Sequence, residues 1–178
     1  MNWRYGRFAA LGVDDLYDAL ALRSQVFVVE QNCVFLDADG ADRASGHLRG
    51  RDEAGVLHAY LRVVDPGVKF AEPSIGRVIT SEAARGTGLG HQLVAEGVAR
   101  CTAAWPGLPI RIGAQSRLES FYACHGFVRE GDDYIEDGIP HCEMVRPAVL
   151  IPIPIAIAIA IPMPMPMPMP MPMPVPIR

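Results

Sequence analysis

The stretch RVITSEAARGTGLGHQLVAEGV, residues 77–98, decides how this chain is expected to fold. Its centre places Gly86, Gly88 and Gly90 in alternation shortly after Arg85. A glycine costs a helix roughly 1 kcal/mol relative to alanine, so three of them beside an amphipathic run need a reason. The β-branched residues before them and the helical spacing after them predict a strand, a glycine-rich turn and a helix.

Three kinds of site use glycines at such a turn. A phosphate-binding P-loop requires GxxxxGK followed by Ser or Thr, and the lysine is absent here. A dinucleotide fingerprint requires GxGxxG, whereas this chain has GxGxG in the middle of its sequence. The third kind needs only bare backbone amides at a helix N-terminus, facing a pyrophosphate, with a basic residue before them. Arg85 supplies that residue, and we favour this interpretation.

The segments around this stretch predict alternating strands and helices. In chain order they are an N-terminal strand, a helix near residues 13–28, a hairpin of residues 47–51 and 56–64, a strand at 75–80, a helix from 89 to before 105, a strand at 109–114, a short helix at 117–125, and an antiparallel pair at 127–129 and 139–145. This order predicts one α/β domain over residues 1–147, with a mixed sheet.

The first of these helices is expected to be amphipathic. Asp14 and Asp15 lie near its start, where the helix macrodipole favours acids. A single stripe at helical spacing collects Val13, Leu16, Tyr17, Leu20, Ser24, Phe27 and Val28.

The segment 148–178 differs from the rest of the chain: it is a low-complexity tail of Ile, Pro, Ala and Met with no charge until Arg178. Its length and apolarity raise the question of a membrane span. Proline at every second position of its second half forbids a helix, so we expect no span. An extended polyproline-like tail and a product of repeat expansion in the coding DNA both remain, and we expect it to be unstructured.

The composition limits the classes of partner and cofactor that we expect this protein to bind. The formal net charge of −4 gives no general attraction for nucleic acid or anionic lipid, so we expect neither as a partner. The four cysteines form no CxxC pair and no secretory signal precedes them, which indicates reduced thiols and a cytoplasmic protein. Asp37, Asp39 and Asp42 have faint calcium-loop spacing, but Gly40 is misplaced and no glutamate closes the loop, so no metal is expected.

In its glycine-rich segment and in a second segment further along, the chain resembles the GNAT acetyltransferase superfamily. Arg85, Gly88 and Gly90 fit its pattern of Gln or Arg, two residues, Gly, one residue, and Gly or Ala. A second feature follows in SRLESFYACHGF, where Tyr122 precedes a Gly-Phe pair. The resemblance implies a single-domain GNAT (acyl-CoA N-acyltransferase) fold, with a mixed, mostly antiparallel sheet flanked by helices. It also implies transfer of acetyl from acetyl-CoA, as co-substrate, to a primary amine within a ternary complex.

The ElaA-type members of that superfamily are similar over about residues 2–147. The segments that carry this similarity are FVVEQNC (27–33), the aspartate loop that ends at His47, IGRVI (75–79), GAQ (113–115) and EDGIPH (136–141). The resemblance implies that a strand and the glycine loop bind the cofactor, through Val78, Ile79, Thr80, Arg85, Gly86, Thr87, Gly88, Leu89, Gly90 and His91.

The candidate catalytic residues are Tyr122, Glu82 and His141. Tyr122 falls where GNAT enzymes often carry the acid that protonates the CoA thiolate; the alternative is a core aromatic packed beside Phe121. Glu82 is a candidate base just past the central strand, or else a solvated turn residue. As a neutral imidazole, His141 can serve as a base or orient the acceptor, but a structural histidine is an equal alternative.

Glu30 and Gln31 end the predicted first helix, and an acidic group beside an amide suits an amine acceptor; a helix C-terminal cap region is the alternative. We expect the acceptor to be a small-molecule or peptide amine, and consider a homodimer as the assembly. A rival function is a non-catalytic acyl-CoA-binding sensor module. Such a sensor would keep the glycine loop but have no need of Tyr122.

Overall fold

The computed structural model describes residues 1–148. The repeat at 149–178 lies outside the described residues, so the expectation of an unstructured tail stays a prediction. The four cysteines are free thiols, of which only Cys124 is exposed.

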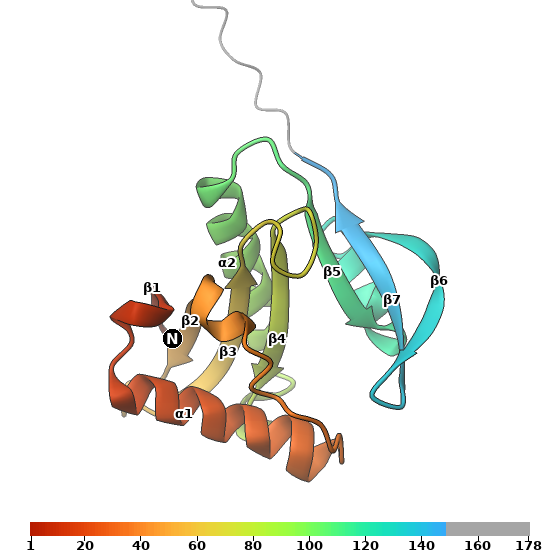
Figure 1. Ribbon diagram of the computed structural model, residues 1–178. Helices are drawn as coiled ribbons and strands as arrows, with labels where there is room; N and C mark the ends of the chain where they lie inside the picture. Colours follow the sequence, from red (N-terminus) through yellow and green to blue (C-terminus); the bar gives the residue numbers. More distant parts are fainter. Residues whose placement is uncertain (149–178) are drawn as a thin grey trace, which may run out of the picture.

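A seven-stranded sheet in the order β1-β2-β3-β4-β5-β7-β6 forms the central layer of the fold (Figure 1). Its strands are β1 (Asn2–Arg7), β2 (Ser45–Arg51), β3 (Leu57–Val64), β4 (Ser74–Thr80), β5 (Ile110–Gln115), β6 (Val128–Glu136) and β7 (Ile139–Arg146). All neighbours are antiparallel except β4 and β5, which are parallel. The mixed, mostly antiparallel sheet expected from the sequence is thus confirmed.

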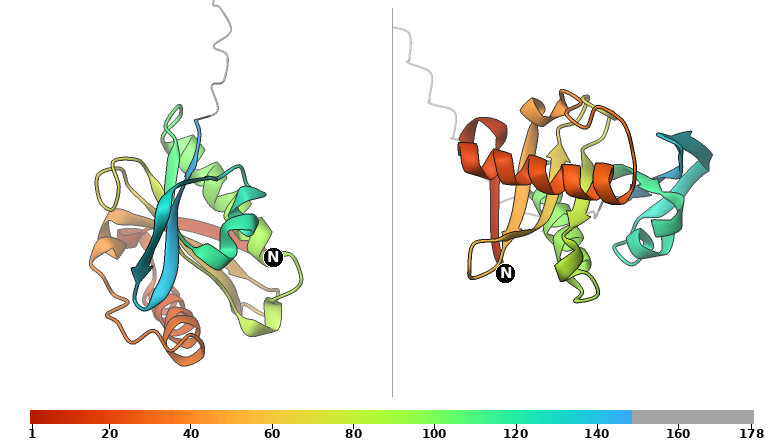
Figure 2. Two further views of the ribbon diagram at one scale, coloured as in Figure 1. Left: turned by 90° about the vertical axis from the view of Figure 1, so that its right-hand side faces the viewer. Right: turned by 90° about the horizontal axis from the view of Figure 1, so that it is seen from below.

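Helices cover both faces of this sheet. Helix α1 (Val13–Arg23) lies across one face and α2 (Leu89–Ala104) across the other, as the two views of Figure 2 show. Helix α3 (Glu119–Ala123) follows β5 after a 3₁₀ turn at Ser116–Leu118. Helix α2 approaches β3 closely at Gly97, where an added Cβ would stand 2.7 Å from Leu61 Cδ2. The glycine is therefore needed for packing of the helix on the sheet.

The face that the first helix buries is not the predicted stripe. Val13 and Tyr17 are 86% and 72% exposed, while Ala19, Arg23 and Val26 are buried against the sheet. The buried face includes a charged residue, which a search for apolar spacing passes over. After α1 the chain widens into a π-helix, Ser24–Glu30, and this change of period also displaces Phe27 and Val28 from an ideal helical stripe.

Strand β6 is longer than expected, because it runs to Glu136 and not only to residue 129. It is an edge strand whose residues are exposed almost throughout, so its polar sequence shows no apolar alternation. The irregular pairing between Glu130 and Tyr134 breaks the period again.

Strands β4 and β5 diverge beyond their first residues. Only Ser74 and Arg111 are paired between them, after which β5, β7 and β6 separate from β1 to β4 (Figure 1). Strand β4 also carries a bulge against β3, since Gly76 and Ile79 pair with Arg62 and Tyr60. Within the bulge Arg77 has a φ of +53°, an uncommon value for a residue other than glycine. The splay and the bulge together leave the side of β4 open to a cavity.

Candidate active site

A first pocket lies over the glycine loop, which we define as residues 85–90; we call it the glycine-loop pocket. Its lining comes from the end of β4, this loop, the start of α2 and one aromatic side chain of α3: Thr80, Ala84, Arg85, Gly86, Gly88, Leu89, Gly90, His91 and Phe121. Seven of these nine residues were among the ten predicted to bind the cofactor.

The backbone of the glycine loop is bare. Gly86 and Gly88 have φ values of +76° and +81°, and a Cβ added at either would meet nothing within 4 Å. Gly88 is the N-cap of α2, and its carbonyl accepts from His91 and Gln92. The first N–H groups of a helix have no intrahelical acceptor, so those of Leu89 and Gly90 remain available. The first turn contains no acidic residue that would offset the positive end of the helix.

The basic residue of the loop is held in place by two acceptors. Arg85 Nη2 donates to Glu30 Oε2 at 2.5 Å and to the Thr80 carbonyl at 3.2 Å. Thr87 donates its hydroxyl to the Ala84 carbonyl at 2.7 Å. Glu30, which the sequence suggested as a residue that binds the amine substrate, therefore contacts Arg85 on the cofactor side of the site.

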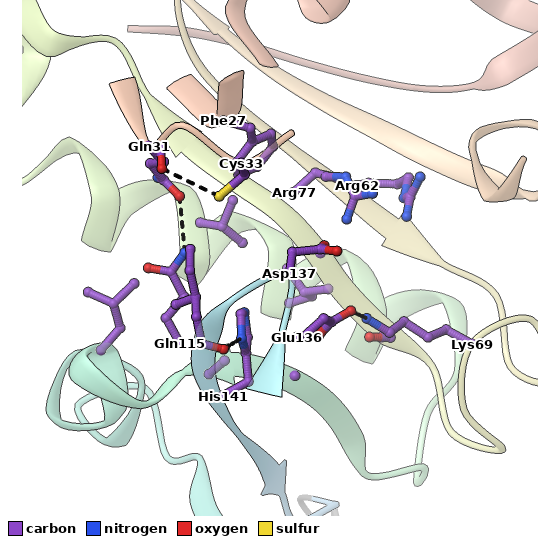
Figure 3. A pocket seen from close by; sticks show the side chains of 18 of the residues that line it. Phe27, Gln31, Cys33, Arg62, Lys69, Arg77, Gln115, Glu136, Asp137 and His141 are labelled. Atoms are coloured by element: carbon purple, nitrogen blue, oxygen red, sulfur yellow. Dashed lines mark hydrogen bonds and ion pairs between the residues drawn. The ribbon is translucent and has the colours of Figure 1, made fainter. Parts of the chain in front are cut away.

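The second pocket opens where β4 and β5 diverge, and we call it the sheet-cleft pocket (Figure 3). Four predicted site residues line it: Gln31, Val78, Tyr122 and His141. Val78 and Thr80 are two residues apart on β4, and Thr80 lines the glycine-loop pocket. One strand therefore supplies wall residues to both pockets.

Tyr122 is buried, with 7% of its surface exposed, and its ring makes edge contacts with Phe121 and Phe127. Burial raises the pKa of its phenol to about 12, so the hydroxyl is protonated at any ordinary assay pH. It thus packs in the core, which was the alternative given by the sequence, and it also lines the sheet-cleft pocket; its role as an acid stays a prediction.

The tautomer of His141 follows from its partner. Its Nδ1 lies 2.9 Å from the Ile139 carbonyl oxygen, which can only accept, so Nδ1 carries the proton in the neutral ring. That leaves Nε2 as the acceptor, the form that a base needs. Tyr134 stacks on the ring at a centroid distance of 5.9 Å and limits its rotation.

Two amides meet near this histidine in the sheet-cleft pocket, since Gln115 pairs with His141 between β5 and β7. Gln115 Nε2 donates to Gln31 Oε1 at 3.1 Å, which joins the end of β5 to the end of the first helix (Figure 3). Gln115 Oε1 in turn accepts from Arg117 Nε at 2.9 Å. The amide groups of Gln31 and Gln115 are therefore oriented by each other rather than free to rotate.

The remaining predicted residues lie elsewhere. Glu82 is exposed in a 3₁₀ turn, Glu82–Ala84, and lines neither pocket. Ile79 is 4% exposed and packs with Ala19 and Tyr60 in the core beneath α1. The geometry therefore brings His141, and not Glu82, to the wall that Tyr122 shares.

An arginine–aspartate network, missed by the sequence reading, supports one wall of the sheet-cleft pocket. Arg62 Nη1 and Nη2 donate to Asp39 at 2.7 Å each, and Arg23 Nη1 donates to Asp42 at 2.8 Å. Burial alone would raise the pKa of Asp42, but the Arg23 and Arg62 guanidiniums outweigh it and lower that pKa. The whole network comprises Arg23, Arg62, Arg77, Asp37, Asp39 and Asp42.

This network explains the aspartates that have faint calcium-loop spacing: their carboxylates pair with arginines. Within residues 1–148, no group of three or more His, Cys, Asp or Glu side chains is arranged to hold a metal ion. Among the residues that the structure describes, no helix has the length and apolar character to cross a bilayer.

Other pocket residues had no signal of their own in the sequence. Lys69 comes from the β3–β4 connection, Cys33 follows the first helix, and Glu136 and Asp137 lie at the β6–β7 turn. Only the similarity of FVVEQNC and EDGIPH to ElaA-type chains pointed to three of these four positions; nothing pointed to Lys69.

Comparison with known proteins agrees with this arrangement. The sequence model of a protein family, described as an acetyltransferase (GNAT) domain, matches residues 24–147. The UPF0039 protein sll0451 of Synechocystis is 44% identical over 145 residues, which cover 82% of this chain and 94% of that protein. Protein ElaA of Escherichia coli is 41% identical over 153 residues, 84% of this chain and 98% of ElaA.

Two crystal structures superpose well. An acyl-CoA N-acyltransferase from Pseudomonas aeruginosa has a TM-score of 0.77, and E. coli ElaA has 0.76. Each is 41% identical, with 82% of this chain and 98% of the other covered. The chain belongs to the GNAT acetyltransferase family and resembles its ElaA-type members, and its single domain has the GNAT fold.

Proposed function

We propose that this protein transfers an acetyl group from acetyl-CoA to a primary amine by direct transfer in a ternary complex. The observation that carries the proposal is that β4 lines two pockets, one at Thr80 with bare helix amides and one at Val78 with Tyr122 and His141. A donor that lies along β4 from the glycine loop would present its reactive end to the second pocket. Catalysis would then rest mainly on positioning.

The glycine-loop pocket fits the pyrophosphate of CoA. The amides of Leu89 and Gly90 and the positive end of α2 favour an anion. Gly86 and Gly88 leave the space above the loop free of side-chain atoms. Arg85 adds a cation at the edge of this pocket.

In the sheet-cleft pocket the two titratable groups have complementary tasks. His141 Nε2 accepts the proton that the acceptor ammonium must lose before the amine attacks the thioester carbonyl. Tyr122 donates a hydrogen bond, and then its proton, to the CoA sulfur as the C–S bond breaks. The second proton that the amine nitrogen loses then restores the Tyr122 hydroxyl. Because burial makes this phenol a weak acid, donation depends on contact with the developing charge on sulfur. Gln31 and Gln115 orient the acceptor by hydrogen bonds.

The test has two steps. Calorimetry with acetyl-CoA measures donor binding, and release of free CoA thiol in the presence of a panel of small amines and peptides measures transfer. We expect saturable binding and amine-dependent release by the wild-type chain. Binding without thiol release, for every amine in a broad panel, would instead support the acyl-CoA sensor. Absence of binding would contradict both functions.

A further inference from the structure

The sheet-cleft pocket already contains a primary amine that belongs to the chain. Lys69 is the only lysine in the sequence, where the other fifteen of the sixteen basic Lys and Arg residues are arginines. It comes from the β3–β4 connection, and its side chain reaches across to β5 and the β6–β7 turn (Figure 3). A cation at this position has no role in the chemistry proposed above.

The groups around the Lys69 ammonium hold it only loosely. Its Nζ is 3.8 Å from Glu136 Oε1, beyond hydrogen-bond distance, and both side chains are about 40% exposed. It lies 5.5 Å from the Phe70 ring centroid. A Cβ built on Gly113 would stand 3.8 Å from Nζ, 4.0 Å from Glu136 Oε2 and 2.8 Å from the Tyr134 hydroxyl. The three polar groups therefore converge on the space beside Gly113, which has no side chain of its own to fill it.

This cluster is acidic overall. Glu136 and Asp137 both line the pocket at this end, against the single charge of Lys69. The other pocket arginines are engaged: Arg62 and Arg77 pair with aspartates of the arginine–aspartate network, and Arg117 donates to Gln115. Burial, with the Glu136 and Glu143 carboxylates, raises the pKa of Tyr134 to about 12. The acidic end therefore suits an ammonium, and the chain supplies one.

Resting on the proposed function, we propose that Lys69 is a site of self-acetylation. The Lys69 ammonium loses one proton to Glu136 or water, and the neutral Nζ attacks the thioester carbonyl carbon of acetyl-CoA. An N–C bond forms, the C–S bond breaks, and the second proton goes to the CoA sulfur. The products are acetyl-lysine, CoA thiol and one proton. No further reactant is needed.

Acetylation changes the pocket. It removes the ammonium that faces Glu136 there and leaves a neutral amide in its place. The Glu136 and Asp137 carboxylates then lose the ammonium that competes with an external amine. The modified protein should therefore bind a cationic acceptor more tightly than the unmodified protein does.

The single lysine makes the test direct. Wild-type protein is incubated with acetyl-CoA and its intact mass is followed; an increase of about 42 Da is expected. Cleavage at arginine then isolates residues 63–77, which carry Lys69, and separates this site from the N-terminal amine. The Lys69→Arg variant keeps the positive charge and should show no acetylation at this position.

Chemical acetylation by free acetyl-CoA is separated from self-acetylation by a second variant. Gly88→Trp blocks the proposed pyrophosphate position, so it should modify Lys69 at least about tenfold more slowly, and excess CoA should slow the wild type. Equal rates in wild type and Gly88→Trp would overturn the proposal. So would an unmodified Lys69 in a protein that binds acetyl-CoA by calorimetry, and the proposed function would survive that result. Absence of acetyl-CoA binding would contradict both.

Discussion

Arg85 of the glycine loop donates to the Glu30 carboxylate at 2.5 Å, across fifty-five residues of sequence. The contact joins the end of the first helix to the proposed pyrophosphate pocket. Arg85 is 44% exposed and Glu30 22%, which places the pair in the class of surface ion pairs worth about 0.2–1 kcal/mol.

We therefore expect Glu30→Gln to bind CoA about twofold to fivefold more tightly, because a carboxylate no longer competes for Arg85 or repels the pyrophosphate. Calorimetry at low and high salt measures the change, which should shrink as salt rises. Glu53→Gln, at an exposed turn residue, is the matched control. Weaker binding by Glu30→Gln would mean that the carboxylate holds Arg85 in its binding position.

Gly88→Trp should abolish CoA binding while the domain stays folded. The side chain would enter the open space above the loop, and the φ of +81° adds strain of roughly 1–2 kcal/mol. Gly55→Trp is a close control, since Gly55 has a φ of +86° and the same open surroundings in the β2–β3 turn. Similar melting temperatures for the two variants, with binding lost only in Gly88→Trp, are the expected result. Equal CoA affinity in both variants would contradict the assignment of the loop.

Tyr122→Phe should slow acetyl transfer by about 100-fold to 10,000-fold and leave acetyl-CoA binding near the wild-type value. The substitution keeps the ring contacts with Phe121 and Phe127 and removes only the hydroxyl. Single-turnover rates are the measurement, with exposed Tyr17→Phe as control. Because burial raises the pKa of this phenol to about 12, the wild-type rate should show no loss from its ionisation below about pH 10. A full single-turnover rate in Tyr122→Phe would make the residue a packing residue only.

The base is identified by comparing two variants. His141→Gln should reduce single-turnover transfer by about 100-fold or more, since His141 lines the pocket with Tyr122. Glu82→Gln should remain within about threefold of wild type, because Glu82 is exposed and lines neither pocket. The reverse ranking would transfer the role of base to Glu82.

The buried network predicts how stability depends on pH. The arginines hold the pKa values of Asp39 and Asp42 below their usual range despite burial. Stability from these carboxylates is therefore present above about pH 4 and is lost as the pH falls through the lower folded-state values. Asp42→Asn should cost about 3–5 kcal/mol at pH 7, because two buried guanidiniums lose a partner. Its stability should then fall less steeply below pH 4.

Urea unfolding at several pH values measures both effects. Asp65→Asn, which breaks the exposed pair with Arg7, should cost only about 0.2–1 kcal/mol. Equal losses in the two variants would show that the network contributes no more than a surface ion pair.

The parts of the site that were predictable are local in sequence. The glycine loop could be predicted because Gly86, Gly88 and the following helix lie within a few residues of one another. Backbone positions with a positive φ favour glycine, so they can be recognised in the sequence. The sheet-cleft pocket is different. Lys69, Gln115 and His141 come from separate segments that meet only because β4 and β5 diverge after one pair. No spacing within any one segment records that divergence.

The arginine–aspartate network shows the same limit. Asp37, Asp39 and Asp42 were visible as a cluster, but their partners are spread from Arg23 to Arg77. The buried face of the first helix escaped prediction for a related reason. Its central residue, Arg23, is fully buried only because the distant loop pairs with it. A charge at helical spacing is read as a solvent-facing residue when its partner is unknown.

The single residue pair between β4 and β5 also separates the proposed donor site from the acceptor side. The N-terminal part of the sheet and α2 carry the proposed donor site, whereas β5, β7 and the β6–β7 turn supply Gln115, His141 and Glu136 on the acceptor side. Because so little backbone pairing connects the two parts, substitutions in one are weakly constrained by the other. Divergence of acceptor preference among relatives should therefore concentrate after residue 110 and around Gln31, while the glycine loop varies less.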